Sequence, residues 1–380
     1  MRRQAEIGLL VALCFFLPLY EAPKTIAWAA YALVWLVNRI VDRDFGGRWD
    51  GWDSLIAAWL GSGVLVALVA GWHGYEWRGA LDLVRYGSVL WLLKRSRFTV
   101  REQQWLLGAL VASTLVGLAM GYAALWRGTE PTLQLNSVGH VNHTGIYLAI
   151  MLGVSVAWLF TGRWPVLAGV VALAVLVSLF ITASRGALGA ALIAVAVLSL
   201  AWWRRARWPA VCAALLLTAT VVIGVFGHAG VFEKNRGQIE AGDLLNYRDH
   251  VWRIAVSGWE AHPWFGVGVD NFKVLTRAEQ EPYRSLFPHA HSLYLNTLAE
   301  RGIVGTLPVA ALLIAWLVAL VRWRPAAEDA EIEWLLWGAA ATAWIVTCVA
   351  GTVNTTLHHE HGLLVALLLG LWLAQRRSTL

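Results

Sequence analysis

Long apolar runs, separated by short polar turns, occupy most of the chain. A membrane helix needs about 20 mostly apolar residues. On this measure we expect twelve spans, near residues 6–22, 25–41, 54–72, 79–93, 103–125, 141–161, 164–182, 187–203, 208–227, 293–321, 332–351 and 361–375. Continuous apolar runs exclude an outer-membrane barrel, whose strands alternate apolar and polar residues. The pattern therefore predicts an all-α polytopic membrane protein with about twelve transmembrane helices. Very short turns, one after Arg163 and one around Arg185, predict two helical hairpins.

The segment 228–301 is the one extended hydrophilic stretch, and long loops are usually functional or disordered. Apolar side chains recur in it at three- and four-residue spacing, at Leu244, Tyr247, Val251, Ala255 and Trp259. This spacing predicts an amphipathic helix at 244–260 lying on the membrane surface, ended by His262 and Pro263. We therefore divide the chain into spans one to nine (1–227), a loop with an interfacial helix (228–292), and spans ten to twelve (293–380).

Composition supports a lipid environment. Apolar residues make up 58% of the 380 residues and charged residues only 14%, against about 25% in soluble domains. This balance excludes a soluble enzyme, a nucleic-acid-binding domain and a disordered chain. The net charge of +6 then marks cytoplasmic loops rather than a nucleic-acid partner.

The basic residues predict the orientation. With twelve spans, 17 of the 30 Lys and Arg fall on the side that carries both termini. The short loops on the other side hold only Lys24, Arg78, Arg127 and Arg185. Because basic loops stay in the cytoplasm, we expect both termini there and the loop 228–292 outside.

All eleven histidines lie outside the predicted spans or at their outer ends. Either the outer loops are simply longer and more polar, or proton-transfer chemistry faces the exterior. His289 and His291 do not share a helix face, and no third ligand of suitable spacing stands near them. In the run 358–361, only His358 and His361 would share a face. We therefore expect no metal site.

Three arginines stand where a membrane protein would otherwise exclude charge. Arg85 lies within a predicted span, where it is either functional or paired with Asp82. Arg185 lies in a short outer turn beside Gly186, and Arg248 lies on the amphipathic helix, where a plain surface charge is the alternative. Guanidinium groups bind phosphate oxygens bidentately. The natural ligand for several of them at one membrane edge is a lipid-linked pyrophosphate.

Two motifs that could signal nucleotide chemistry carry little weight. Asp42 and Asp44 match the DxD of nucleotide-sugar transferases, but we expect them to form a solvated turn in a basic cytoplasmic loop. Gly266 and Gly268 form a tight turn without the preceding strand and third glycine of a dinucleotide site. No nucleotide is expected.

A family signature completes this picture. His291 and Ser292, followed after nine residues by Gly302 and Gly305, resemble the signature of the bacterial O-antigen ligase family, within the O-antigen ligase/polymerase superfamily. Further features shared with the family are the turn Ser184-Arg185-Gly186 and the loop residues Arg248, Trp252, His262, Pro263, Gly266 and Gly268.

The resemblance implies a glycosyltransferase of the bacterial inner membrane. Its donor is a glycan on undecaprenyl pyrophosphate, its acceptor a sugar hydroxyl of lipid A–core, and its active site faces the periplasm. The resemblance also implies no cofactor, no metal and inversion at the anomeric carbon. Arg185 and Arg248 would bind the pyrophosphate, with Arg85 as a further candidate. His291 would be the general base, and His289 either its rival or a group that orients substrate. Alternatively both histidines only cap the following helix.

Other activities remain open at this point. A polysaccharide polymerase and a protein O-oligosaccharyltransferase belong to the same superfamily. A function of a different class, that of a lipid-glycan transporter, is less favoured. Transporters typically have internal repeats or charges at the membrane midplane, and the sequence shows no repeat.

Overall fold

The computed structural model describes residues 2–71, 74–203, 205, 248–278 and 287–379, and this part of the chain is helical without strands. Its helices are α1 (Arg2–Phe16), α2 (Glu21–Asp42), α3 (Gly51–Val69), α4 (Glu76–Lys94), α5 (Val100–Trp126), α6 (Val141–Phe160), α7 (Pro165–Ile181), α8 (Arg185–Trp202), α11 (Arg248–Ala261), α12 (Phe272–Ala278), α13 (Leu293–Arg322), α14 (Glu331–Ala350) and α15 (His359–Thr379). The all-α polytopic prediction is confirmed.

Eleven of the twelve predicted spans coincide with helices, and the ninth, near 208–227, lies outside the described residues. Six described helices are long and apolar enough to cross a membrane, namely α3, α5, α6, α8, α13 and α14, and α7 is a shorter apolar helix. The predicted surface helix appears as α11, which ends at Ala261 directly before His262 and Pro263. Its predicted start at 244–247 lies outside the described part.

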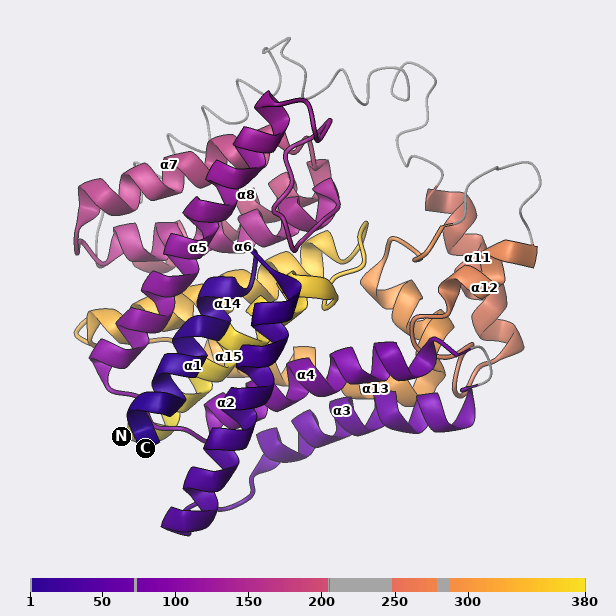
Figure 1. Ribbon diagram of the computed structural model, residues 1–380, viewed down its shortest axis with the longest axis horizontal. Coiled ribbons are helices and arrows are strands. Elements are labelled where there is room, and N and C mark those ends of the chain that lie inside the picture. The colour runs from indigo at the N-terminus through magenta and orange to yellow at the C-terminus, as the bar shows by residue number, and fades with distance from the viewer. Residues whose placement is uncertain (1, 72–73, 204, 206–247, 279–286, 380) are drawn as a thin grey trace.

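Buried helices form the centre of the molecule. α6, α14 and α15 are largely buried along their length. α4 packs on α15, while α8 packs on α6 and α14. In Figure 1, α14 and α15 lie between a group made of α5, α7 and α8 and a group made of α3, α4 and α13. α6 and α7 form the predicted hairpin, but α7 and α8 do so only in part, because they touch near their turn and α8 then packs elsewhere.

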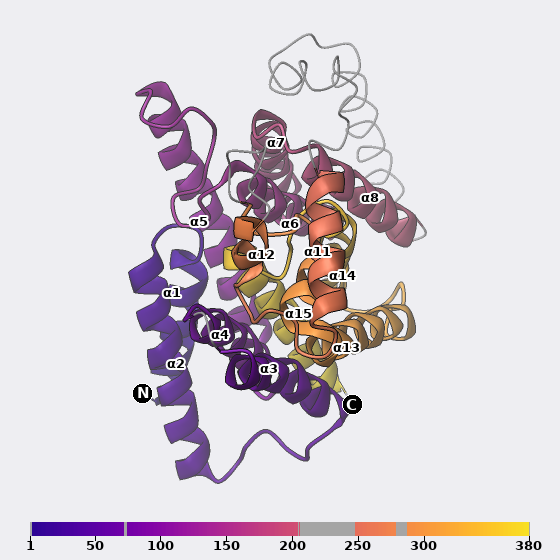
Figure 2. The same cartoon turned by 90° about the vertical axis from the view of Figure 1, so that its right-hand side faces the viewer.

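The loop helices α11 and α12 cover one end of this bundle. α11 packs against α13, with α12 beside both (Figure 2). Both chain ends lie on the opposite side of the molecule in Figure 1. The molecule thus has a terminal end and an opposite loop end.

A break inside α13 joins the loop to the bundle. Gly302 has φ +56° and ψ −159°, so the helical path is interrupted there, and only glycine adopts this conformation readily. The turn 262–268 packs into the break, so closely that a β-carbon on Gly266 would lie 2.4 Å from the carbonyl carbon of Glu300. Both motif glycines therefore serve the same close approach of two backbones.

Hydrogen bonds repair the interrupted helix. Four backbone N–H groups bridge the two segments: Val267 N to Ala299 O (3.0 Å), Gly268 N to Glu300 O (2.9 Å), Ile303 N to Pro263 O (2.9 Å) and Val304 N to Trp264 O (3.1 Å). Buried backbone groups need such partners. Because the amides of Val267 and Gly268 are used here, this turn does not serve as a phosphate-binding loop, as the sequence indicated.

Candidate active site

The loop end brings together five segments that are far apart in the sequence. They are residues 137–143 at the start of α6, the α7–α8 turn 182–186, the start of α11, the segment 287–292 before α13, and the segment 353–361 before and within α15. The predicted site residues Arg185, Arg248, His289 and His291 all belong to these segments.

Segment 353–354 is where the two arginine-bearing segments meet. Arg248 donates from Nε to the carbonyl oxygen of Val353 at 2.9 Å. Gly186, next to Arg185, faces the same residue, since a β-carbon there would lie 2.7 Å from Val353 Cγ2. Arg185 opens α8, so its guanidinium starts from a helix terminus at the site. The segments that carry the two arginines therefore meet at residues 353–354.

His291 lies within electrostatic range of Arg248. It precedes Ser292, whose hydroxyl caps α13 by accepting from Leu295 N at 3.4 Å. Ser292 rather than a histidine is thus the helix cap. Burial, followed by the positive charge of Arg248, lowers the pKa of His291 to about 4. The imidazole is therefore neutral at neutral pH, the form that a general base requires.

His289 belongs to a different group. Its ring centroid lies 4.7 Å from that of His358 and 6.4 Å from that of His359. His143 lies 4.7 Å from His359 and is hydrogen-bonded to His361, with 3.0 Å between Nδ1 and Nε2. We call these five residues the histidine cluster. Burial lowers the pKa of His289 to about 3, so this ring is also neutral.

Sequence spacing did not reveal this cluster, because the rings nearest His289 come from the distant run 358–361. Ligand nitrogens of His289, His358 and His359 all lie within 4.8 Å of one another. A cavity of about 60 Å³ borders His289 and His358, and Asp82 and Asp270 contribute to its wall. The only sequence signal was the density of histidines in the run 358–361.

Arg85 is held by carboxylates. Its guanidinium forms ion pairs with Glu21 at 3.0 Å and with Asp82 at 3.2 Å, as the pairing alternative predicted. Glu21 also pairs with Lys24, which is buried and forms a further ion pair with Glu360. This network, in which Ser137 Oγ donates to Glu360 at 2.9 Å, fixes the start of α15. Lys24 and Glu360 were missed by the sequence analysis.

Backbone strain concentrates around the same segments. Among the described residues, seven other than glycine have positive φ, and five of them flank the site, at Ala183, Asp270, His291, Leu357 and His359. Each such residue costs on the order of 1–3 kcal/mol and persists where the surroundings enforce it, often at functional sites. The positions of His291 and His359 are therefore imposed by the fold.

Comparison with known families agrees with the geometry. Residues 170–310 match the family model described as O-antigen ligase. This part of the chain is therefore similar to the O-antigen ligase superfamily. Among curated proteins, no match to the chain was found.

The O-antigen ligase segment contains Arg185, Arg248, His289 and His291. The residues that face them lie outside it, since His143 belongs to α6, and Val353 and His358 lie in the loop between α14 and α15. The candidate site in the matched segment is therefore completed by α6 and by the loop between α14 and α15.

Proposed function

We propose that the protein is an O-antigen ligase, which transfers a glycan from undecaprenyl pyrophosphate to a sugar hydroxyl of lipid A–core and so completes lipopolysaccharide. The observation that carries the proposal is the meeting of Arg248 and the Arg185 turn at segment 353–354, with His291 within electrostatic range of Arg248. Two fixed cations beside a neutral histidine suit the displacement of a pyrophosphate by an alcohol.

The reaction balances with these groups alone. The acceptor O–H gives its proton to the ring nitrogen of His291 as the oxygen attacks the anomeric carbon. The bond from that carbon to the pyrophosphate oxygen breaks, and the leaving lipid pyrophosphate carries the electron pair. Arg185 and Arg248 stabilise its developing charge, as preorganised donors do at oxyanions. A single displacement inverts the anomeric carbon.

In other phosphate-transfer sites a divalent metal neutralises the charge of the phosphate groups. We propose that the arginines do so here and that the reaction needs no metal. The purified protein, stripped with EDTA, should transfer glycan at its untreated rate. Activity that is lost in EDTA and returns with Mg²⁺ or Mn²⁺ would contradict this part of the mechanism.

We infer an inner-membrane location with both termini in the cytoplasm and the loop end facing the periplasm. The bias of basic residues toward the terminal end supports this orientation. An alkaline-phosphatase fusion after Leu380 should be inactive, and a fusion with strong activity would overturn it.

The decisive experiment is a lipopolysaccharide gel from cells that lack the protein and are complemented with either the wild type or His291→Ala. Loss of the glycan ladder over an intact core, restored only by the wild type, is the expected result. Caps of one repeat unit in the deletion strain would instead show a polymerase, and an unchanged ladder would refute both activities.

A further inference from the structure

The histidine cluster contains a set of three ligands that the proposed transfer reaction does not use. His289 comes from the segment before α13, whereas His358 and His359 come from the segment that leads into α15. Their rings are close, with centroids 4.7 Å apart for His289 and His358 and 3.8 Å apart for His358 and His359. These residues are nearly 70 positions apart in sequence, so the tertiary fold creates the set.

We propose that His289, His358 and His359 bind a late transition-metal ion of the Zn²⁺ class and that this ion fastens the two segments together. The ligand nitrogens lie within 4.8 Å of one another. In a tetrahedral zinc site with bonds of about 2.0–2.1 Å, they would be about 3.4 Å apart. Rotation of the imidazoles about their side-chain torsions covers this difference, so the backbone need not move.

A second observation points to an absent ligand. Nε2 of His358 is buried and has no hydrogen-bond partner among the described residues. A buried nitrogen without a partner is costly, and such an atom in a folded protein calls for an explanation. A metal ion beside His289 and His359 supplies one.

The surroundings suit an ion with three imidazole ligands. The cavity of about 60 Å³ that borders His289 and His358 exceeds the 10–15 Å³ or so that one water molecule needs, so water can occupy the fourth position. His143 packs at 4.7 Å from His359 and positions that ring from the far side. Imidazole ligands select zinc, copper or nickel, whereas magnesium and calcium prefer oxygen.

The ion would act on structure rather than on transfer chemistry. Since His289 and His291 are two residues apart, a bound ion would tie the segment of the proposed base to the segment whose Val353 carbonyl accepts from Arg248. The metal site stands independently of the ligase proposal, because it needs only the three ligands.

The test is a titration of the full-length protein, purified in detergent through a tag without histidines and stripped with EDTA. Co²⁺ should bind with one equivalent per chain and give the strong visible absorption of a tetrahedral complex, which Zn²⁺ removes and Mg²⁺ does not. Zn²⁺ should also raise the thermal midpoint. His358→Gln should weaken Co²⁺ binding at least tenfold, and His262→Gln, which alters an exposed histidine outside the cluster, should leave it unchanged.

Wild-type protein that shows no saturable binding at one equivalent would overturn the proposal, whatever the variants do. Equal affinity in the wild type and in the triple variant His289→Gln, His358→Gln, His359→Gln would overturn it as well. Glycan transfer is measured separately. Inactive protein that binds Co²⁺ argues against the ligase proposal alone, and active protein that does not bind it argues against the metal site alone.

Discussion

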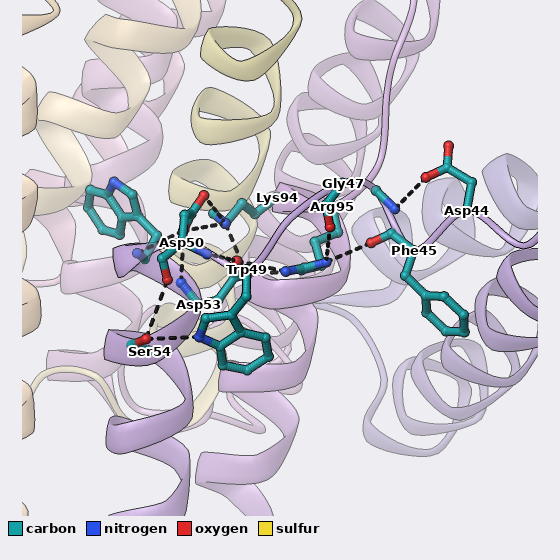
Figure 3. Close-up of polar contacts among 11 residues, drawn as sticks. Asp44, Phe45, Gly47, Trp49, Asp50, Asp53, Ser54, Lys94 and Arg95 are labelled. Carbon is teal, nitrogen blue, oxygen red and sulfur yellow. Dashed lines mark hydrogen bonds and ion pairs between the residues drawn. The ribbon is translucent and has the colours of Figure 1, made fainter.

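Two polar clusters, one at the terminal end and one at the loop end of the molecule, differ in how completely their polar groups are partnered. At the terminal end, Asp53 is fully buried. Its carboxylate accepts two hydrogen bonds from the guanidinium of Arg95, at 2.7 and 3.0 Å, and forms an ion pair with Lys94 at 3.0 Å. Asp50 also accepts from Lys94 and caps α3 (Figure 3). At the loop end, the histidine cluster gathers rings whose hydrogen bonds are incomplete, since Nε2 of His358 and Nδ1 of His361 are buried without a partner among the described residues.

This difference distinguishes polar groups that stabilise the fold from polar groups that are available to bind a ligand. In the terminal cluster, the buried carboxylate of Asp53 is paired with Lys94 and Arg95, so it has no need of a ligand. We therefore infer that this cluster holds α3, α4 and the 44–50 loop together. The DxD sequence there also has structural partners, because Asp44 accepts from Gly46 N at 2.8 Å and Asp42, at the end of α2, pairs with Arg2 of α1. The loop end keeps unsatisfied atoms, as expected of a site that awaits substrate or an ion.

Breaking the terminal cluster should produce the largest effect on folding. Asp53→Ala leaves Lys94 and Arg95 buried without their shared partner, which costs about 3–5 kcal/mol for a buried pair. We expect a low yield and a clearly lower thermal midpoint in detergent. The matched control is Asp44→Ala in the neighbouring exposed loop, which should behave as the wild type. Equal midpoints for Asp53→Ala and the wild type would show that the cluster is not structural.

At the loop end, a comparable change should abolish activity and spare the fold. His291→Ala removes the proposed base, so the transfer rate should fall by about 10²–10⁴-fold, the usual contribution of general-base catalysis. Thermal midpoint and donor binding should stay near wild-type values. His262→Ala, which alters an exposed histidine outside the histidine cluster, is the control, and His289→Ala tests the rival base. A dead His289→Ala beside an active His291→Ala would move the base to His289, and full activity in both would refute a histidine base.

Arginine geometry gives a smaller effect. Arg185→Lys and Arg248→Lys keep the charge but lose the planar fork. Losing a hydrogen bond to a charged group costs about 1.5–3 kcal/mol, which corresponds to roughly 10- to 100-fold in rate. Arg85→Lys should cost less, because Arg85 is already engaged by Glu21 and Asp82. Wild-type rates in both the Arg185 and the Arg248 variant would refute pyrophosphate binding there.

The smallest effect is expected at the exposed ion pair of the terminal end. The side chains of Arg2 and Asp42 are 55% and 50% exposed, and solvent-exposed pairs contribute about 1 kcal/mol or less. Arg2→Gln should change the thermal midpoint little and leave glycan transfer intact. A loss of stability as large as that of Asp53→Ala would mean that burial does not separate the two ends.

Much of the fold followed from sequence because membrane helices are local features. Apolar length predicted eleven described helices, and the spacing of Val251, Ala255 and Trp259 predicted α11 up to its end at Ala261. The sequence analysis did not predict the break at Gly302, since its cause is the packing of Gly266 against a distant helix.

The sequence predicted several individual residues of the candidate site but not which of them lie together. Arg185, Arg248 and His291 stood out individually as charges or signature residues. The contacts of His289 with His358, and of Lys24 with Glu360, depend on which helices become neighbours. Linear spacing carries no information on such pairs, so a ligand set drawn from two distant segments was invisible before the tertiary structure.

The repaired break in α13 also explains the fixed count of residues in the signature. Ser292 caps the N-terminus of the helix, and the turn 262–268 is hydrogen-bonded to the helix on both sides of Gly302. At a helical rise of 1.5 Å per residue, the ten residue steps from Ser292 to Gly302 span about 15 Å along the helix axis. One inserted residue would shift His291 by about 1.5 Å along the axis and turn it by about 100°. The number of intervening residues therefore sets both the height of His291 along the helix axis and its direction around that axis.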